Sequence, residues 1–294
     1  MSIDAQQLAT LDAVVREGSF ELAARALRVT PSAVSQRVKA LEQSVGQVLV
    51  RRARPCRVTT AGEPLLRLAG QVALLEREAM GAARGTVGGS RVRATVVVNA
   101  DSLFTWFLPA LAALPADLAL FDVREDDQDH TAELLRDGTA MAAVTSLDAP
   151  VQGCRSVRLG TMRYLAMAAP SGVDRWFARG AGAAAFAAAP VLVLNRKDQL
   201  QHRFLRAVAR RHLDPPVHYV PSAWGFVQAV RLGLGWGLVP EQVARPDLDA
   251  GTLVDLAPGR HLDVPLHWQH WRLDSPLLRS LTAAVAAAAA AALR

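Results

Sequence analysis

The pattern of apolar and polar residues in the first 62 positions predicts three short helices. Residues 31–45 repeat apolar side chains every three or four positions, which is the spacing of a helix with one buried face. Thr30 is suited to cap this helix, and Pro31 occupies its first position, where a missing N–H costs nothing. Two amphipathic segments precede it, one ending at Gly18 and one capped by Ser19. The spacing of the last two helices is typical of a helix-turn-helix.

The face of residues 31–45 that lies outside the apolar stripe carries hydrogen-bond donors and positive charge. Serine and glutamine side chains hydrogen-bond base edges, whereas arginine and lysine bind phosphate. The residues of this face are Ser32, Ser35, Gln36, Arg37 and Lys39, with Glu42 as its one acid. Residues 49–60 (LVRRARPCRVTT) then alternate short apolar and basic residues, which predicts a basic wing. An ordinary amphipathic helix pair has the same helix spacing, but the wing makes DNA binding the favoured interpretation.

The distribution of charge agrees with a nucleic-acid partner. Residues 1–62 hold nine basic and five acidic side chains, a net charge of +4, while the whole chain of 294 residues has a net charge of +6. Most of the excess therefore lies in a fifth of the chain, as expected of a surface that binds phosphate. The total is less informative, because 31 of the 33 basic residues are arginine, a bias that nucleotide composition alone can produce.

Composition bounds the compartment and the number of domains. The length fits two or three domains. Cys56 and Cys154 lie far apart and match no metal-ligand spacing, so we expect a reducing compartment and no disulfide scaffold. The first residues, MSIDAQQLATLDAVV, contain no basic leader, and the sequence shows no apolar stretch of membrane-spanning length outside its alanine run. A cytoplasmic protein is expected.

Residues 63–84 form a second long helical pattern, with apolar residues in near-heptad order. These residues are Leu65, Leu68, Val72, Leu75 and Ala79. Two copies can pair through such a seam, or the seam can pack on its own domain, and the pattern alone leaves both open. Residues 85–90 (GTVGGS) are glycine-rich and predict a hinge.

From Arg93 the pattern changes to short β-branched strands that alternate with helices, which predicts an α/β fold with a mostly parallel sheet. The segment is long enough for two subdomains. The C-terminal helix, from Ser275 onwards, ends in an alanine run that forms helix readily and offers no chemistry.

Residues 99–103 (NADSL) follow an expected strand and open a helix. Ligands bind at this edge of open α/β sheets, and the free N–H groups of a helix start attract anions. Those N–H groups, from Asn99 and Ala100 onwards, and the Ser102 hydroxyl can hold a carboxylate, while Asp101 can hold an ammonium group. The competing interpretation is that Asp101 or Ser102 merely caps the helix.

Other polar loops follow later strands and are expected to converge on the same cleft. Residues 126–131 (DDQDHT) offer Asp127 and Asp129 to a cationic ligand, although a solvated acidic turn is the commoner outcome. His130 has no partner at metal-ligand spacing, so no metal site is expected. The remaining polar candidates are Thr145, Asp198 and Ser222.

No sequence motif points to an enzyme. The chain contains no G-x-S-x-G, no paired Cys and His and no metal triad, and catalysis would leave the helix-turn-helix without a purpose. Residues 233–238 (GLGWGL) differ from a phosphate loop because a helix precedes them, and they are better interpreted as a helix end that leads into a strand.

Residues 8–68 resemble the winged helix-turn-helix of the LysR-type transcriptional regulators. The resemblance lies in AARALRVTPSAVSQRVKALEQSVGQVLVRR and in TTAGEPLL, although the family often has Gln where Pro31 stands. It implies a winged helix-turn-helix at 1–62, a dimerising linker helix and hinge at 63–91, and a two-subdomain effector domain of the periplasmic-binding-protein kind at 92–294. Subdomain I would comprise 92–162 and 266–294, and subdomain II 163–265.

The resemblance also assigns roles and partners. It implies that Ser35 and Gln36 read bases, and that the phosphate contacts come from Thr30, Ser32, Arg37, Lys39, Arg52, Arg54 and Arg57. The implied partners are double-stranded DNA, further copies of the chain in a dimer or tetramer, and RNA polymerase. The alternatives are a LysR-type regulator of another small-molecule effector and an architectural DNA-binding protein without an effector.

Later segments narrow the resemblance to the lysine/arginine-export regulator subgroup. They include VNADSLFTWFLPAL, DDQDHTAELLRDG and GFVQAVRLGLGWGLVPE, whereas Trp224 departs from the pattern. The subgroup senses basic amino acids and activates an exporter gene, so no cofactor beyond lysine or arginine as effector is implied. Asp101 would take the α-ammonium group, and the distal cation would be taken by Asp127, Asp129 or Asp198.

Overall fold

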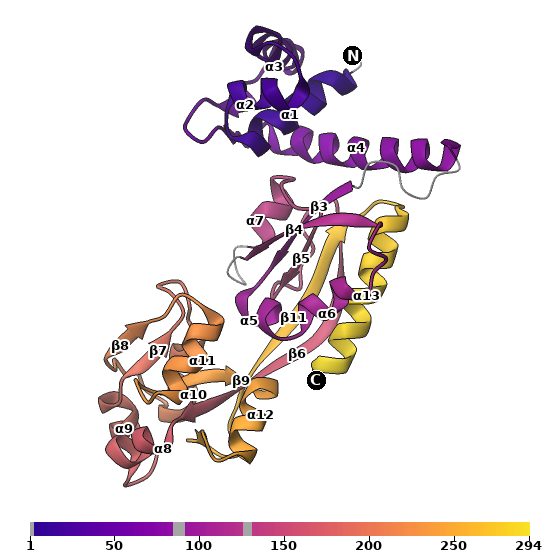
Figure 1. Cartoon of the computed structure of the whole chain (residues 1–294). Helices are drawn as coiled ribbons and strands as arrows, with labels where there is room; N and C mark the ends of the chain where they lie inside the picture. Colours follow the sequence, from indigo (N-terminus) through magenta and orange to yellow (C-terminus); the bar gives the residue numbers. More distant parts are fainter. Residues whose placement is uncertain (1–2, 85–91, 126–130) are drawn as a thin grey trace.

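The computed structural model describes residues 3–84, 92–125 and 131–294. A helical N-terminal part is followed by one long helix and then by two lobes (Figure 1). The expected hinge at 85–90 and the expected acidic residues Asp127 and Asp129 lie outside the described residues. None of the helices described combines the length and the apolar composition needed to cross a membrane.

The N-terminal part is a three-helix unit with a two-stranded wing. Its elements are α1 (Ala5–Glu17), α2 (Phe20–Leu27), α3 (Pro31–Val45), β1 (Val50–Arg51) and β2 (Arg57–Val58). The Thr30 hydroxyl accepts a hydrogen bond from the N–H of Ala33 at 3.2 Å, and Pro31 is the first residue of α3. The helix start predicted from the sequence is therefore confirmed. β1 pairs antiparallel with β2.

The apolar stripe of α3 forms the core of this part. Val34, Val38 and Leu41 are at most 1% exposed and belong to one cluster with side chains of α1 and α2. Burying a valine or leucine contributes roughly 1.5–3 kcal/mol, so this stripe fixes α3 in place. The opposite, polar face of α3 is consequently directed outward.

Helix α4 (Glu63–Arg84) lies between the N-terminal part and the lobes (Figure 1). Leu65 packs against the N-terminal cluster, whereas Leu74 is buried in the same cluster as Trp271 of the lobes. Leu68 and Leu75 are 36% and 40% exposed. The helix thus packs on its own chain through one set of residues while these two members of the predicted seam remain at the surface.

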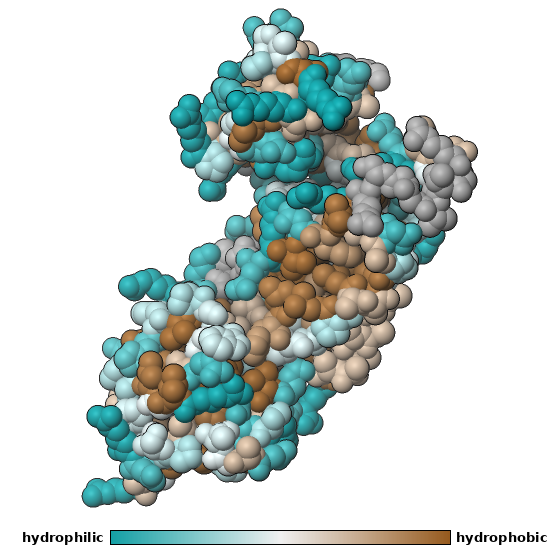
Figure 2. Space-filling model, in the orientation of Figure 1, coloured by the Kyte–Doolittle hydropathy of each residue, from teal (hydrophilic) through white to brown (hydrophobic). Residues whose placement is uncertain are grey.

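The first lobe is a sheet covered by helices. Its elements are β3 (Val92–Val98), α5 (Ala100–Ser102), the π-helical turn η1 (Leu103–Phe107), α6 (Leu108–Ala112), β4 (Ala119–Glu125), α7 (Thr131–Arg136), β5 (Ala142–Thr145) and α13 (Pro276–Ala292). β3 is central and runs parallel to both β4 and β5. Hydrophobic residues gather over this lobe in the view of Figure 2.

Two long strands, β6 (Cys154–Ala168) and β11 (Leu262–Trp271), connect the lobes. They pair antiparallel with each other, and β11 also pairs antiparallel with β5. With β10 (Val254–Asp255) at one edge, the sheet order is β10-β6-β11-β5-β3-β4. The prediction of a mostly parallel sheet is therefore wrong. The alternation of strands and helices misses this, because β6 leaves the first lobe and β11 returns to it in the opposite direction.

The second lobe contains the remaining elements, which are α8 (Pro170–Gly172), η2 (Val173–Phe177), α9 (Ala183–Ala188), β7 (Val191–Val193), α10 (Leu200–Ala209), β8 (Val217–Tyr219), α11 (Ala223–Arg231), β9 (Gly237–Pro240), α12 (Glu241–Asp249) and β10 (Val254–Asp255). Phe186 and Trp236 lie at its centre with ring centroids 4.9 Å apart. Gly233, with φ of +75°, follows the end of α11 and leads towards β9, as expected for a helix end before a strand.

Candidate nucleic-acid interface and effector cleft

The outward face of α3 begins with two hydroxyl groups that contact each other. The Thr30 and Ser32 hydroxyls lie 2.9 Å apart, and both residues are exposed. Gln36 and Lys39 are also exposed, whereas Ser35 and Arg37 are partly buried. Because the first N–H groups of a helix carry partial positive charge, this end of α3 is suited to a phosphate.

The one acid of α3 is turned away from that face. A carboxylate oxygen of Glu42 accepts hydrogen bonds from the backbone N–H groups of Leu49 at 2.9 Å and Val50 at 3.4 Å. Glu42 therefore fixes the entry to the wing. Its negative charge is used there and does not oppose an approaching polyanion.

The predicted phosphate contacts of the wing are exposed cations. Arg52, Arg54 and Arg57 are exposed and form no ion pair with the residues that the structure describes. The Arg52 guanidinium lies 4.6 Å from the centroid of the Phe20 ring, which orients it. The backbone N–H of Cys56 donates to the carbonyl of Gly18 at 2.8 Å and ties the wing to the end of α1.

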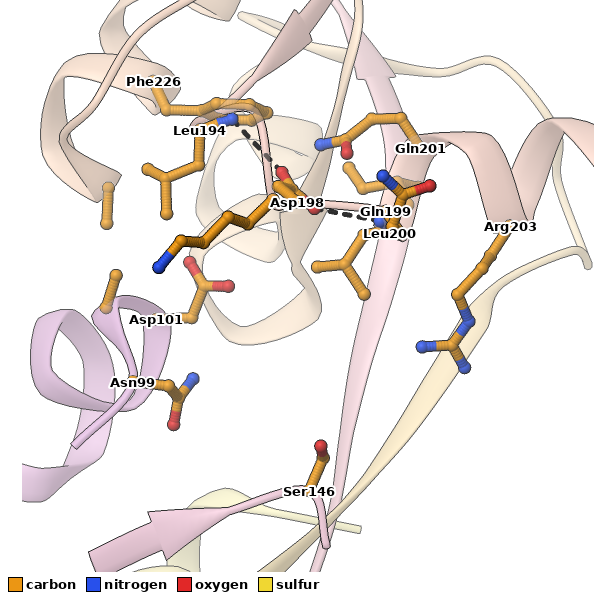
Figure 3. Close-up of a pocket in the computed structure, with 14 residues that line it drawn as sticks. Asn99, Asp101, Ser146, Leu194, Asp198, Gln199, Leu200, Gln201, Arg203 and Phe226 are labelled. Atoms are coloured by element: carbon orange, nitrogen blue, oxygen red, sulfur yellow. Dashed lines mark hydrogen bonds between the residues drawn. The ribbon is translucent and has the colours of Figure 1, made fainter. Parts of the chain in front are cut away.

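The second candidate site is a cavity of ≈ 120 Å³ between the lobes. The first lobe contributes Asn99, Ala100, Asp101 and Ser146, and the second contributes a run of residues from the loop before α10 and from α10 itself (Figure 3). The run comprises Leu194, Lys197, Asp198, Gln199, Leu200, Gln201 and Arg203. Two segments that are distant in sequence therefore face one another across the cleft.

Asp101 is the most strongly perturbed acid of the cleft. Its carboxylate accepts a hydrogen bond of 2.7 Å from the hydroxyl of Tyr164 on β6. Burial raises the pKa of Asp101 to about 6, although the Tyr164 hydrogen bond opposes that shift, and the negative charges of Asp198 and Glu125 add to it. No cation forms an ion pair with Asp101 among the described residues. An ionised Asp101 is therefore costly to the protein and favourable for a cationic ligand.

Two amides of the cleft are buried and incompletely hydrogen-bonded. Asn99 and Gln201 are both 2% exposed, and within the described part of the chain both amide atoms of Asn99 and the Oε1 atom of Gln201 have no hydrogen-bond partner. An unsatisfied buried polar group costs about 1–3 kcal/mol. Because one amide comes from each lobe, a polar ligand between them would satisfy both.

The other predicted ligand residues lie in different surroundings. Asp198 lines the cleft, but its carboxylate also accepts hydrogen bonds from the N–H groups of Leu194 at 3.1 Å and Leu200 at 2.9 Å. Ser102 and Thr145 are fully buried and do not line the cavity. Ser222 caps α11 through the N–H of Gly225, at the rim, where Ala223 is the lining residue.

Sequence reasoning missed several residues of the cleft. Lys197 and Gln201 lie within the polar run RKDQLQ, so a signal for them was present beside Asp198. The sequence around Tyr164 does not indicate a cleft residue, because Tyr164 is a lone tyrosine in an apolar strand and is far from Asp101 in sequence. Neither Asp101 nor Ser102 caps the helix predicted at 99–103, because the cap position of α5 is Asn99, two residues before Asp101 and three before Ser102.

Comparison with known proteins identifies two matching families. Residues 5–63 match the bacterial regulatory helix-turn-helix proteins of the lysR family, and residues 89–290 match the LysR substrate binding domain. The transcriptional regulator LysG of Mycobacterium tuberculosis is 53% identical over 287 residues, which cover 98% of this chain and 94% of LysG. The lysine export transcriptional regulatory protein LysG of Corynebacterium glutamicum is 46% identical over 296 residues, which cover 98% of this chain and 98% of that protein.

Two solved structures are similar to the whole chain. ArgP from Mycobacterium tuberculosis has a TM-score of 0.91 and 52% identity, with 100% of this chain and 99% of ArgP covered. LysG from Corynebacterium glutamicum with the bound effector Arg has a TM-score of 0.80 and 44% identity, with 99% of each chain covered.

The burial of Asp101 predicts a pH-dependent cost to folding. Because the pKa of Asp101 is raised from 3.8 to about 6 in the folded chain, its contribution to stability is fully present below pH 4 and is lost as the pH rises through 6. Asp101→Asn should therefore be up to about 3 kcal/mol more stable than the wild type at pH 7 and similar to it at pH 4. Urea unfolding at both pH values measures this, with the exposed Asp117→Asn as control. A less stable Asp101→Asn at pH 7 would show that the charge is not costly.

The two kinds of DNA contact predict different responses. Gln36→Ala should lose discrimination between operator and random duplex, because a base contact contributes about 1–3 kcal/mol of discrimination. Arg54→Ala should weaken binding to both duplexes and reduce the salt slope by about one. Fluorescence anisotropy over a salt series measures both, and Arg206→Ala on α10 is the control. Intact specificity in Gln36→Ala would remove Gln36 from the recognition surface.

Proposed function

We propose that this chain, which belongs to the LysR family of bacterial transcription regulators, senses lysine or arginine and controls an amino-acid exporter gene. The relatives that match it over its whole length are transcription regulators, and this chain is likewise a transcription regulator and not an enzyme. The observation that carries the proposed effector is the partly buried Asp101, which lies in an inter-lobe cavity without a cationic partner among the described residues. The LysG structure with bound Arg supports a basic amino acid as the effector.

The proposed DNA contacts follow from exposure and charge. Ser35 and Gln36 read base edges, and Thr30, Ser32 and the basic residues of α3 and the wing hold phosphates. Those basic residues are Arg37, Lys39, Arg52, Arg54 and Arg57. The hydroxyls at the start of α3, together with its N–H groups, support phosphate binding there.

The proposed effector contacts combine charge with unsatisfied amides. Asp101 holds the α-ammonium group of the amino acid, and the amides of Asn99 and Gln201 accept and donate the remaining polar contacts. The N–H groups at the start of α5, from Ala100 onwards, hold the carboxylate, with Lys197 as a second, cationic partner from the other lobe. Asp198 is the acid proposed for the distal cation, because it lines the same cavity.

The proposed domains each carry one function. Residues 1–62 bind DNA, 63–91 dimerise, and 92–294 bind the effector, with subdomain I at 92–162 and 266–294 and subdomain II at 163–265. The boundaries between the subdomains fall within β6 and β11. We also propose a cytoplasmic, nucleoid-associated dimer or tetramer that acts on RNA polymerase and uses no cofactor other than its effector.

Selectivity for a basic amino acid is testable by calorimetry. Lysine and arginine should bind the wild type more tightly than leucine, because leucine has no distal cation to interact with the carboxylate of Asp198. Asp101→Asn should lower the affinity for lysine and for arginine by at least about 30-fold, since losing one partner of a buried charge pair costs about 2–5 kcal/mol of binding free energy. Asp117→Asn, an exposed acid of the same lobe, should bind as the wild type does. Equal affinities for leucine and lysine, or an indifferent Asp101→Asn, would contradict the proposed effector.

The seam of α4 is testable by the size of the assembly. Replacing the exposed Leu68 and Leu75 with Glu places charges where a second copy of α4 would pack, so monomers with weak operator binding are expected. Arg77→Glu, on another exposed position of α4, should leave the assembly unchanged. Light scattering after size exclusion measures the mass. An unchanged mass for the Leu68→Glu, Leu75→Glu variant would exclude the seam as the interface.

A further inference from the structure

A second concave site lies on the first lobe, away from the cleft between the lobes. It is a groove of ≈ 590 Å³ between helix α13 and the ends of β6 and β11. None of its lining residues lines the effector cleft. Ligand pockets typically measure about 300–1,000 Å³, so the groove is large enough for a small organic molecule.

Three arginines from three different elements converge on this groove. Arg155 lies on β6, Arg272 follows β11, and Arg279 lies in the first turns of α13. Arg155 is directly opposite His270 in the β6–β11 ladder, so their side chains share one face of the sheet. Arg272 is two residues beyond His270 and continues the same face. The opposing wall is α13, which contributes Thr282 and Ala283.

The positive charge of the groove is poorly compensated. Arg279 pairs with Asp274, whose side chain is 91% exposed, whereas Arg155 and Arg272 form no ion pair with described residues. Arg279 also lies near the N-terminus of α13, the end of a helix that repels cations. All three arginines are exposed, so their mutual repulsion is screened by water and an anion can reach them from solvent.

The floor of the groove is apolar and includes one neutral imidazole. Val157 and Leu278 contribute apolar surface, and His270 is 9% exposed. Burial and the charge of Arg155 lower the pKa of His270, although its hydrogen bond to the carbonyl of Trp271, at 2.8 Å, opposes that shift. Because that carbonyl can only accept, Nδ1 carries the proton.

We propose that this groove is a second ligand site, which binds a small organic anion with two or more negative charges, such as a phosphate ester or a polycarboxylate. Arg155 and Arg272 bind the anionic groups, and Arg279, which is paired with Asp274, lines the edge of the site. The apolar floor packs against the carbon skeleton of the ligand. Guanidinium groups bind phosphate and carboxylate oxygens in pairs, which suits either chemistry. The site goes beyond the amino-acid sensor proposed above and does not depend on it.

The groove lies beside residues that contact α4, the helix that leads to the DNA-binding part. The segment 270–274 that lines it leads directly to Ser275, whose hydroxyl donates to Glu78 of α4 at 2.6 Å. The adjacent Trp271 packs against Gly70 of α4, where an added Cβ would lie 2.6 Å from the indole ring. An anion that orders this segment would therefore stabilise the contact between α4 and the first lobe.

Hydrogen exchange of the full-length chain tests the site, with inorganic pyrophosphate and citrate as probes and sodium chloride at equal ionic strength as control. At ten times the dissociation constant, local opening of residues 153–157 and 270–283 should slow about tenfold. Arg155→Gln with Arg272→Gln should abolish that protection, whereas Arg179→Gln with Arg206→Gln, two exposed arginines of the second lobe, should retain it. Pyrophosphate protection without citrate protection would assign a phosphate ester, and the reverse would assign a polycarboxylate.

Three results would overturn the proposal. They are equal protection by chloride, protection that persists in Arg155→Gln with Arg272→Gln, and protection confined to the basic N-terminal part. The melting temperature of the same double variant provides an independent check, because removing converging cations should leave it equal to or above that of the wild type. A clearly lower melting temperature would mean that these arginines serve folding, and the proposal would fail.

Discussion

The partly buried carboxylate of Asp101 is the constraint on which the ligand-binding half of the molecule depends. Its charge is desolvated, is held by one hydroxyl from β6 and faces Asp198 across the cleft. A fold selected only for stability would replace such a group, because an uncompensated buried charge is unfavourable. Its position between two lobes, beside amide atoms of each lobe that have no partner among the described residues, supports the proposed cationic ligand.

The same geometry connects the cleft to the DNA-binding part. Tyr164 lies on β6, which together with β11 joins the lobes, and β11 ends next to α4. Arg67 of α4 donates to the backbone carbonyls of Gln152 and Arg136, and Glu78 accepts from Ser275. Gly138, with φ of +79°, permits the close approach, because a Cβ there would lie 2.5 Å from the Arg67 backbone nitrogen. A change in the strands that join the lobes therefore reaches α4 through direct contacts.

Local chemistry made much of this structure predictable from the sequence. The start of α3 follows from a threonine cap and a proline, and α4 has the predicted bounds because its helical pattern is uninterrupted. Residues 99–103 were placed at the cleft because ligands bind where strands end. Tyr164 and Gln201 were missed because only the tertiary fold brings β6 and α10 to Asp101. The direction of β6 and β11 was also missed, since local alternation does not reveal that a strand crosses between lobes.

The central claim is that a cationic amino acid neutralises Asp101, and proton release measures this most directly. Arginine binding at pH 6, titrated calorimetrically in buffers of different ionisation enthalpy, should release up to about half a proton per ligand, because a group with a pKa of about 6 is half protonated there and a bound cation lowers that pKa. Release should vanish at pH 8 and in Asp101→Asn. Binding at pH 6 without proton release would contradict the account.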